Sequence, residues 1–182
     1  MTMNSFGKFS ARFSALMLLS APVFAHPGHG EASFSTGFLH PLTGYDHLTA
    51  LLLIGLFAAG YATKSAWKII GCFALALIGG FAIGVEWADA HQAEALVSLS
   101  LLALPVAILA YRKKGIVKFI SMAAIFAFSA CHGLVQGAES VGSAAQFGLG
   151  SLVSSLMVIT VVMLVSKAVK STIHELKSVK AK

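Results

Sequence analysis

Apolar residues fall in five long stretches, and the short segments between them carry charges or small polar residues. Each stretch has the roughly 20 residues that a helix needs to cross the hydrocarbon core of a bilayer. The pattern therefore predicts an all-α fold, a polytopic bundle of transmembrane helices with no room for a soluble domain. The five predicted spans are residues 40–62, 66–86, 92–111, 117–138 and 146–166.

A shorter apolar segment precedes the spans and has the pattern of a secretory signal peptide. The basic residues Lys8 and Arg12 come first, residues 13–19 are apolar, and residues 23–25 resemble a cleavage site. We expect cleavage after Ala25; without it the segment would remain as an extra helix. The predicted organisation is a signal peptide (1–25), a periplasmic His-rich N-terminus (26–39), a five-helix transmembrane domain (40–166) and a cytoplasmic basic tail (167–182).

The composition agrees with lipid as the main solvent of the chain. Of the 182 residues, 57% are hydrophobic and 11% are charged, whereas an ordinary soluble domain has about 25% charged residues. A soluble protein of this size has too little interior to bury so much apolar surface. These values exclude a disordered chain, a disulfide scaffold and almost any soluble enzyme.

The basic residues set the expected orientation, because short loops that hold Lys and Arg stay in the cytoplasm. With the mature N-terminus outside, all thirteen basic residues, the two of the signal peptide included, fall on the inner side. We therefore expect a multi-pass protein of a bacterial inner membrane, with a periplasmic N-terminus and a cytoplasmic C-terminus. The net charge of +6 then reflects orientation and lipid headgroups, and gives no reason to expect nucleic acid.

Acidic residues and histidines gather on the opposite, outer side. Six of seven acids and six of seven histidines lie on or towards it, although acids contribute little to membrane topology. A site of carboxylates and imidazoles facing the periplasm would produce this segregation. For Asp89 and Glu94, a solvated loop is the simpler interpretation.

The first predicted span opens with histidines at helical spacing. With Pro41 in the first turn, we expect a helix that starts at His40 and places His40, Gly44 and His47 on one stripe. Asp46 lies roughly 100° to one side of His47 on such a helix. Gly44 leaves open space between the two imidazoles.

The fourth predicted span ends with a similar stripe of His132, Gln136 and Glu139. Gly133 and Gly137 form a small-xxx-small pair that lets a neighbouring helix approach closely. Gly80 and Gly84 in the second span are expected to serve helix packing as well.

Depths estimated at about 1.5 Å per residue predict two tiers of polar groups. His47 and His132 come out ~22 and ~21 Å above the inner boundary, while His40 and Glu139 come out ~33 and ~31 Å above it. Buried ionisable groups cost at least a few kcal/mol each in a membrane, which favours a functional role over interhelical packing.

Imidazole and carboxylate together suit borderline divalent ions such as Ni²⁺, Co²⁺ or Zn²⁺. The predicted metal-binding residues are His40, Asp46, His47, His132 and Glu139, with Glu86, His26, His29 and Gln136 as accessory candidates. The N-terminal histidines could equally belong to a mere spacer after the cleavage site.

At these residues the chain resembles the HupE/UreJ family of bacterial nickel and cobalt permeases. The family's His-x5-Asp-His motif is matched by His40, Asp46 and His47. Its Phe-His-Gly-x-[Ala/Val]-x-Gly-x-Glu motif is matched from His132 to Glu139, with Cys131 in place of the usual Phe. The resemblance implies uptake of nickel or cobalt for metalloenzymes.

The expected function is a secondary permease for Ni²⁺ or Co²⁺ that works by facilitated diffusion, with no enzymatic activity and no resident cofactor. No phosphate-binding loop is visible, and a proton-coupled variant stays open. The alternatives are a zinc-dependent intramembrane hydrolase and a metal-binding protein that does not transport. The choice of metal and the oligomeric state are left open by the sequence.

Overall fold

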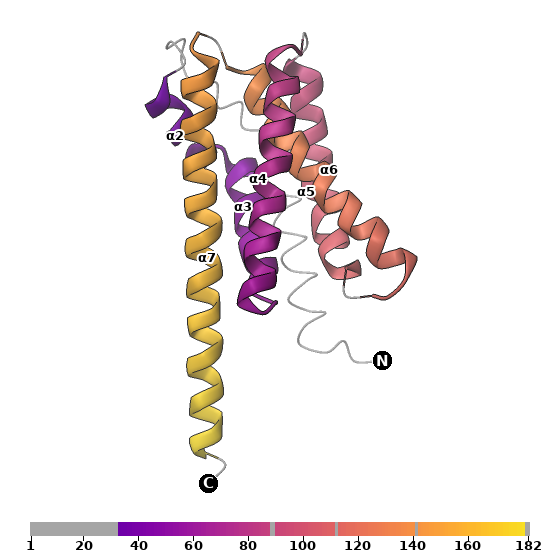
Figure 1. Ribbon diagram of the computed structural model, residues 1–182, viewed down its shortest axis with the longest axis vertical. Coiled ribbons are helices and arrows are strands. Elements are labelled where there is room, and N and C mark those ends of the chain that lie inside the picture. Colours follow the sequence, from indigo (N-terminus) through magenta and orange to yellow (C-terminus); the bar gives the residue numbers. More distant parts are fainter. Residues whose placement is uncertain (1–32, 88–89, 112, 141, 181–182) are drawn as a thin grey trace.

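The computed structural model describes residues 33–87, 90–111, 113–140 and 142–180 (Figure 1). The elements named in it are all helices: α2 (Phe34–Thr43), α3 (Tyr45–Ala58), α4 (Thr63–Val85), α5 (Ala90–Ala110), α6 (Ile116–Ala138) and α7 (Ala144–Lys180). The predicted signal peptide, His26 and His29 lie outside the described residues. The predicted all-α fold is confirmed.

Four of the described helices, α4 to α7, are long and apolar enough to cross a membrane, and the bent pair α2 and α3 would be a fifth span if the two helices cross it together. The chain is therefore a multi-pass membrane protein. The second, third and fourth predicted spans agree with α4, α5 and α6 to within a few residues. Helix α7 continues as one helix of 37 residues, about 55 Å long, and extends well past the other helices (Figure 1).

The first span differs from the prediction of one helix that starts at His40. Helix α2 begins six residues earlier because Ser33 and Thr36 form a capping box. Pro41 then lies inside the helix, where it cannot donate a backbone hydrogen bond, and α2 ends two residues later. Gly44 is extended (φ −77°, ψ 111°), and α3 leaves it at an angle of 76° to α2.

Helices α4 and α6 lie in backbone contact along paired glycines. A Cβ atom on Gly80 would meet the carbonyl of Ala130, and one on Gly133 would meet the carbonyl of Leu77. Gly84 and Gly137 make the same kind of contact one turn further along. This contact fixes the height of His132 relative to the end of α4.

A second glycine contact joins α2 to the start of α7. Gly37 lies against the backbone of Phe147, and Gly150 lies against the backbone of Phe34. The first contact pairs α4 with α6, and the second pairs α2 with α7. His40 Nε2 of α2 lies 3.3 Å from Glu139 Oε2 at the end of α6, and we call this end of the bundle the histidine end.

Candidate functional site

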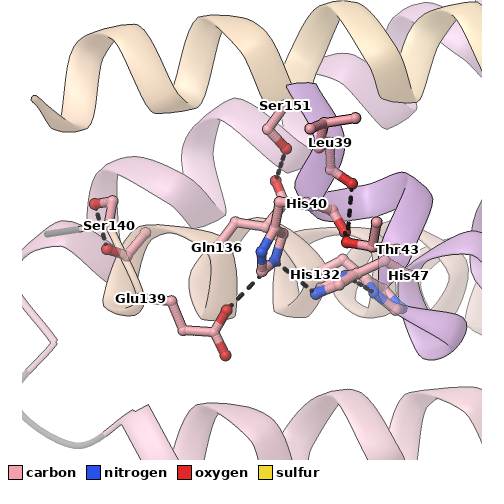
Figure 2. A network of polar contacts seen from close by, with 10 residues as sticks. Leu39, His40, Thr43, His47, His132, Gln136, Glu139, Ser140 and Ser151 are labelled. Atoms are coloured by element: carbon pink, nitrogen blue, oxygen red, sulfur yellow. Dashed lines mark hydrogen bonds and ion pairs between the residues drawn. The ribbon is translucent and has the colours of Figure 1, made fainter. Parts of the chain in front are cut away.

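Three histidines and one glutamate from three helices form a continuous row (Figure 2). Glu139 Oε2 lies 3.3 Å from His40 Nε2, which lies 3.2 Å from His47 Nε2. His47 Nδ1 in turn lies 3.2 Å from His132 Nδ1. The bend at Gly44 makes the contact between the first two histidines, since it turns α2 back over the start of α3. We call Glu139, His40, His47 and His132 the histidine row.

The row runs from the surface into the bundle. The side chain of Glu139 is 28% exposed and that of His40 is 10% exposed, whereas His47 and His132 are buried. The order agrees with the two expected tiers. The expected separation of about two helical turns between His40 and His47 is wrong, because the bend brings their rings into contact.

Ser100 of α5 fixes the protons along the row. Its hydroxyl donates to the carbonyl of Val97 at 2.7 Å, so its oxygen accepts from His132 Nε2, 3.1 Å away. In a neutral row, His132 Nδ1 then carries a lone pair and accepts from His47 Nδ1. His47 Nε2 is left with a lone pair that faces His40. The row therefore presents nitrogen lone pairs towards its exposed end.

Asp46 lies in the first turn of α3, beside the row. Its carboxylate accepts hydrogen bonds from backbone N–H groups of the same turn and interacts electrostatically with His47 first and His132 second. A carboxylate at a helix N-terminus also interacts favourably with the helix dipole.

Glu139 ends α6 at the exposed end of the row. Burial, followed by the nearby carboxylates of Glu94 and Asp46, raises the pKa of Glu139 to about 7. The shift means that Glu94 of α5, interpreted from the sequence as part of a solvated loop, adds to the negative charge around Glu139. Such a cluster of carboxylates attracts cations and would be stabilised by one.

The accessory candidates are arranged differently. Gln136 is buried and accepts a hydrogen bond from Ser151 of α7 at 2.5 Å, which joins α6 to α7 beside the row. Glu86 caps the end of α4 and is exposed, and none of the interactions described above involves it. Phe147 packs its ring edge against His40, with centroids 5.3 Å apart.

The arrangement supplies ligands in pairs. Over the described ranges, which omit residues 1–32, 88–89, 112, 141 and 181–182, no three His, Cys, Asp or Glu side chains converge as a set of metal ligands. Each contact in the row brings together two potential metal ligands. The next ligand lies beyond them, at the following contact of the row. Imidazole and carboxylate ligands of this kind suit borderline divalent metal ions.

Three partners of the row were not predicted from the sequence: Ser100, Glu94 and Phe147. The hydroxyl of Ser100 lies on a helix that is apolar nearly all round, and nothing in its spacing separates it from Ser98. Its role depends on which face of α5 meets α6, and that is a tertiary property.

The sequence profile described as "HupE / UreJ protein" matches residues 14–181. Among curated proteins, Protein HupE of Rhizobium leguminosarum bv. viciae is 28% identical over 96 residues, which are 52% of this chain and 50% of that protein. The chain thus aligns with about half the length of this relative. No solved structure matches the chain. Because the family profile covers nearly the whole chain, together with both histidine motifs, the chain belongs to the HupE / UreJ protein family.

Proposed function

We propose that this protein is a permease that moves a divalent metal ion, nickel or cobalt, across the bacterial inner membrane through the histidine row. The observation that supports this most is the continuity of the row from the part-exposed Glu139 to the buried His132. Neither lysine nor arginine takes part in the row, as a path for cations requires. The chain also belongs to the HupE / UreJ family, whose members are nickel and cobalt permeases, and this supports the same conclusion.

The spacing of the nitrogen atoms suits a passing metal ion. Two nitrogen ligands about 2.1 Å from one metal ion, at an angle of about 90–109°, lie about 3.0–3.4 Å apart. Both histidine pairs have their facing nitrogens 3.2 Å apart. An ion could therefore bind both nitrogens of either pair after the proton between them moves to the other nitrogen of its own ring and the rings turn to direct both lone pairs at the ion. A site of two nitrogens holds the ion weakly enough to release it.

The linear order favours transport over the two alternatives. A zinc hydrolase needs three protein ligands around one ion and an open fourth position. A storage or sensor site would likewise gain affinity from converging ligands. In this proposal, the ion enters at Glu139, passes His40 and His47, and reaches His132, and the inside-negative membrane potential favours its inward movement.

The test is metal flux into proteoliposomes that contain the purified protein and an entrapped metal-sensitive dye. We expect uptake of Ni²⁺ or Co²⁺ by the unmodified protein, and loss of uptake in His132→Gln. The matched control is His174→Gln, because His174 lies on the exposed end of α7, far along the helix from the row. Uptake by His132→Gln equal to that of the control, or lipid hydrolysis in place of flux, would overturn the proposal.

A further inference from the structure

A basic cavity lies at the end of the bundle opposite the histidine row. It has a volume of about 410 Å³ and is lined by Gly60 and Tyr61 after α3, and by Tyr111, Lys113, Lys114 and Lys118 around the connection from α5 to α6. The volume is in the range of small-ligand sites. We call these six residues the lysine pocket.

Tyr61 and Tyr111, which line the lysine pocket, belong to an aromatic cluster. The rings of Phe57, Tyr61 and Tyr111 pack edge to face, with centroids 5.1 to 5.6 Å apart. Lys118 Nζ lies 5.0 Å from the centroid of the Tyr111 ring. Tyrosines at this level are typical of the boundary between the bilayer core and the headgroups.

Two further lysines, on α7, contact backbone carbonyls next to the pocket. Lys167 Nζ donates to the carbonyl of Tyr61 at 2.5 Å, and Lys170 Nζ donates to the carbonyl of Ala59 at 3.3 Å. These bonds satisfy carbonyls at the end of α3 and hold α7 beside the cavity. They also add two positive charges to its surroundings.

The charges of the pocket lysines are not balanced by neighbouring carboxylates. Among the described residues, no carboxylate lies within 4.0 Å of the ammonium groups of Lys113, Lys114 and Lys118, and the His40–Glu139 pair lies at the other end of the bundle. Lys113, Lys114 and Lys118 are exposed side chains clustered around one cavity. Like charges that are held together repel each other unless an anion lies between them.

We propose that the lysine pocket binds the headgroup phosphate of one anionic phospholipid. The pocket has a concave basic surface and aromatic residues in its lining, and it lies where the membrane-spanning helices end. Basic pockets of this kind recognise anionic lipid headgroups. The acyl chains would lie along the apolar surfaces of α5 and α6, where Leu109 and Phe119 are exposed. The proposal does not depend on which ion the histidine row carries, because binding is measured without metal.

The experiment is native mass spectrometry of the full-length protein released from detergent, titrated separately with phosphatidylglycerol, phosphatidylethanolamine and soluble glycerol phosphate. We expect one phosphatidylglycerol molecule to bind with saturation, at least tenfold more tightly than phosphatidylethanolamine. Each pocket lysine removed should weaken binding about fivefold. Lys113→Gln with Lys118→Gln should therefore weaken it about 25-fold.

The matched control is Lys64→Gln with Lys68→Gln, which removes the same charge from the first turns of α4 but leaves the pocket lining intact. We expect less than a threefold change there. Equal losses in the two double variants would overturn the proposal, as would equal binding of the two lipids. Glycerol phosphate that binds as tightly as the lipid would identify a soluble anion and overturn the lipid assignment. Because these lysines are exposed, the single variants Lys113→Gln and Lys118→Gln keep the test available if the double variant does not fold.

Discussion

The proton order of the histidine row depends on one hydroxyl, and removing it should change how the protein handles metal. Ser100→Ala deletes the acceptor of His132 Nε2 in a place where Ser100 is fully buried. The orphaned N–H costs about 1–3 kcal/mol. His132 can avoid this cost only by moving its proton to Nδ1, which would then face the N–H of His47 across 3.2 Å. The row must then shift every proton or lose that contact.

The expected effect follows from the loss of this orienting bond. Outer-sphere partners of metal-binding histidines are worth about 10- to 100-fold in metal affinity. We expect Ser100→Ala to raise the metal concentration for half-maximal uptake by that factor, with a smaller effect on the maximal rate. The assay is the initial rate of Ni²⁺ and Co²⁺ uptake by proteoliposomes over a wide range of metal concentration.

Ser129→Ala is the matched control for this variant. Ser129 is also a buried serine, on the same helix as His132, but its hydroxyl donates only to the carbonyl of Ile125 in its own helix. The two variants therefore lose a similar volume and one hydroxyl each. The same half-maximal concentration in both would refute the argument that Ser100 orients the row.

Three further predictions concern the site and the topology. His47→Ala and His132→Ala should abolish uptake even at high metal concentration, because both side chains are buried. His40→Ala should chiefly raise the metal concentration required for uptake. Equal losses of maximal rate in all three variants, with the protein present in the membrane, would argue against this order. Asp46→Asn keeps the volume and removes the charge, so it should insert normally and stop transport; parental rates would mean that the charge is not used. A periplasm-specific reporter fused after Lys182 should be silent, and strong activity would reverse the expected orientation.

The sequence predicted the fold class because a membrane leaves few solutions. Backbone polar groups in lipid must be satisfied within a helix, so apolar length alone located α4, α5 and α6. The glycines at 80, 84, 133 and 137 could be proposed for packing from their spacing, and they lie at the α4/α6 contact. These features are local or periodic, so they can be recognised in a single sequence.

The features that the sequence did not predict depend on how helices meet. The capping box at Ser33 and Thr36 is a local feature that starts the first helix at Phe34, six residues before His40. The link from Ser100 to His132 has no such signal, because it joins residues 32 positions apart on two helices. The contact between His40 and His47 required knowledge of the bend.

The bend explains why glycine occupies position 44. The backbone there has φ −77° and ψ 111°, a conformation open to any residue, so conformational freedom is not the reason. Space is the reason: a Cβ atom would lie 2.9 Å from Cδ2 of His47 and 3.1 Å from a carboxylate oxygen of Asp46. A side chain would push both groups away from the row. In a straight helix, His40 and His47 would be separated by about 10 Å along the axis. The two histidines are in contact because α2 ends shortly after Pro41 and α3 begins directly after Gly44, at an angle to α2.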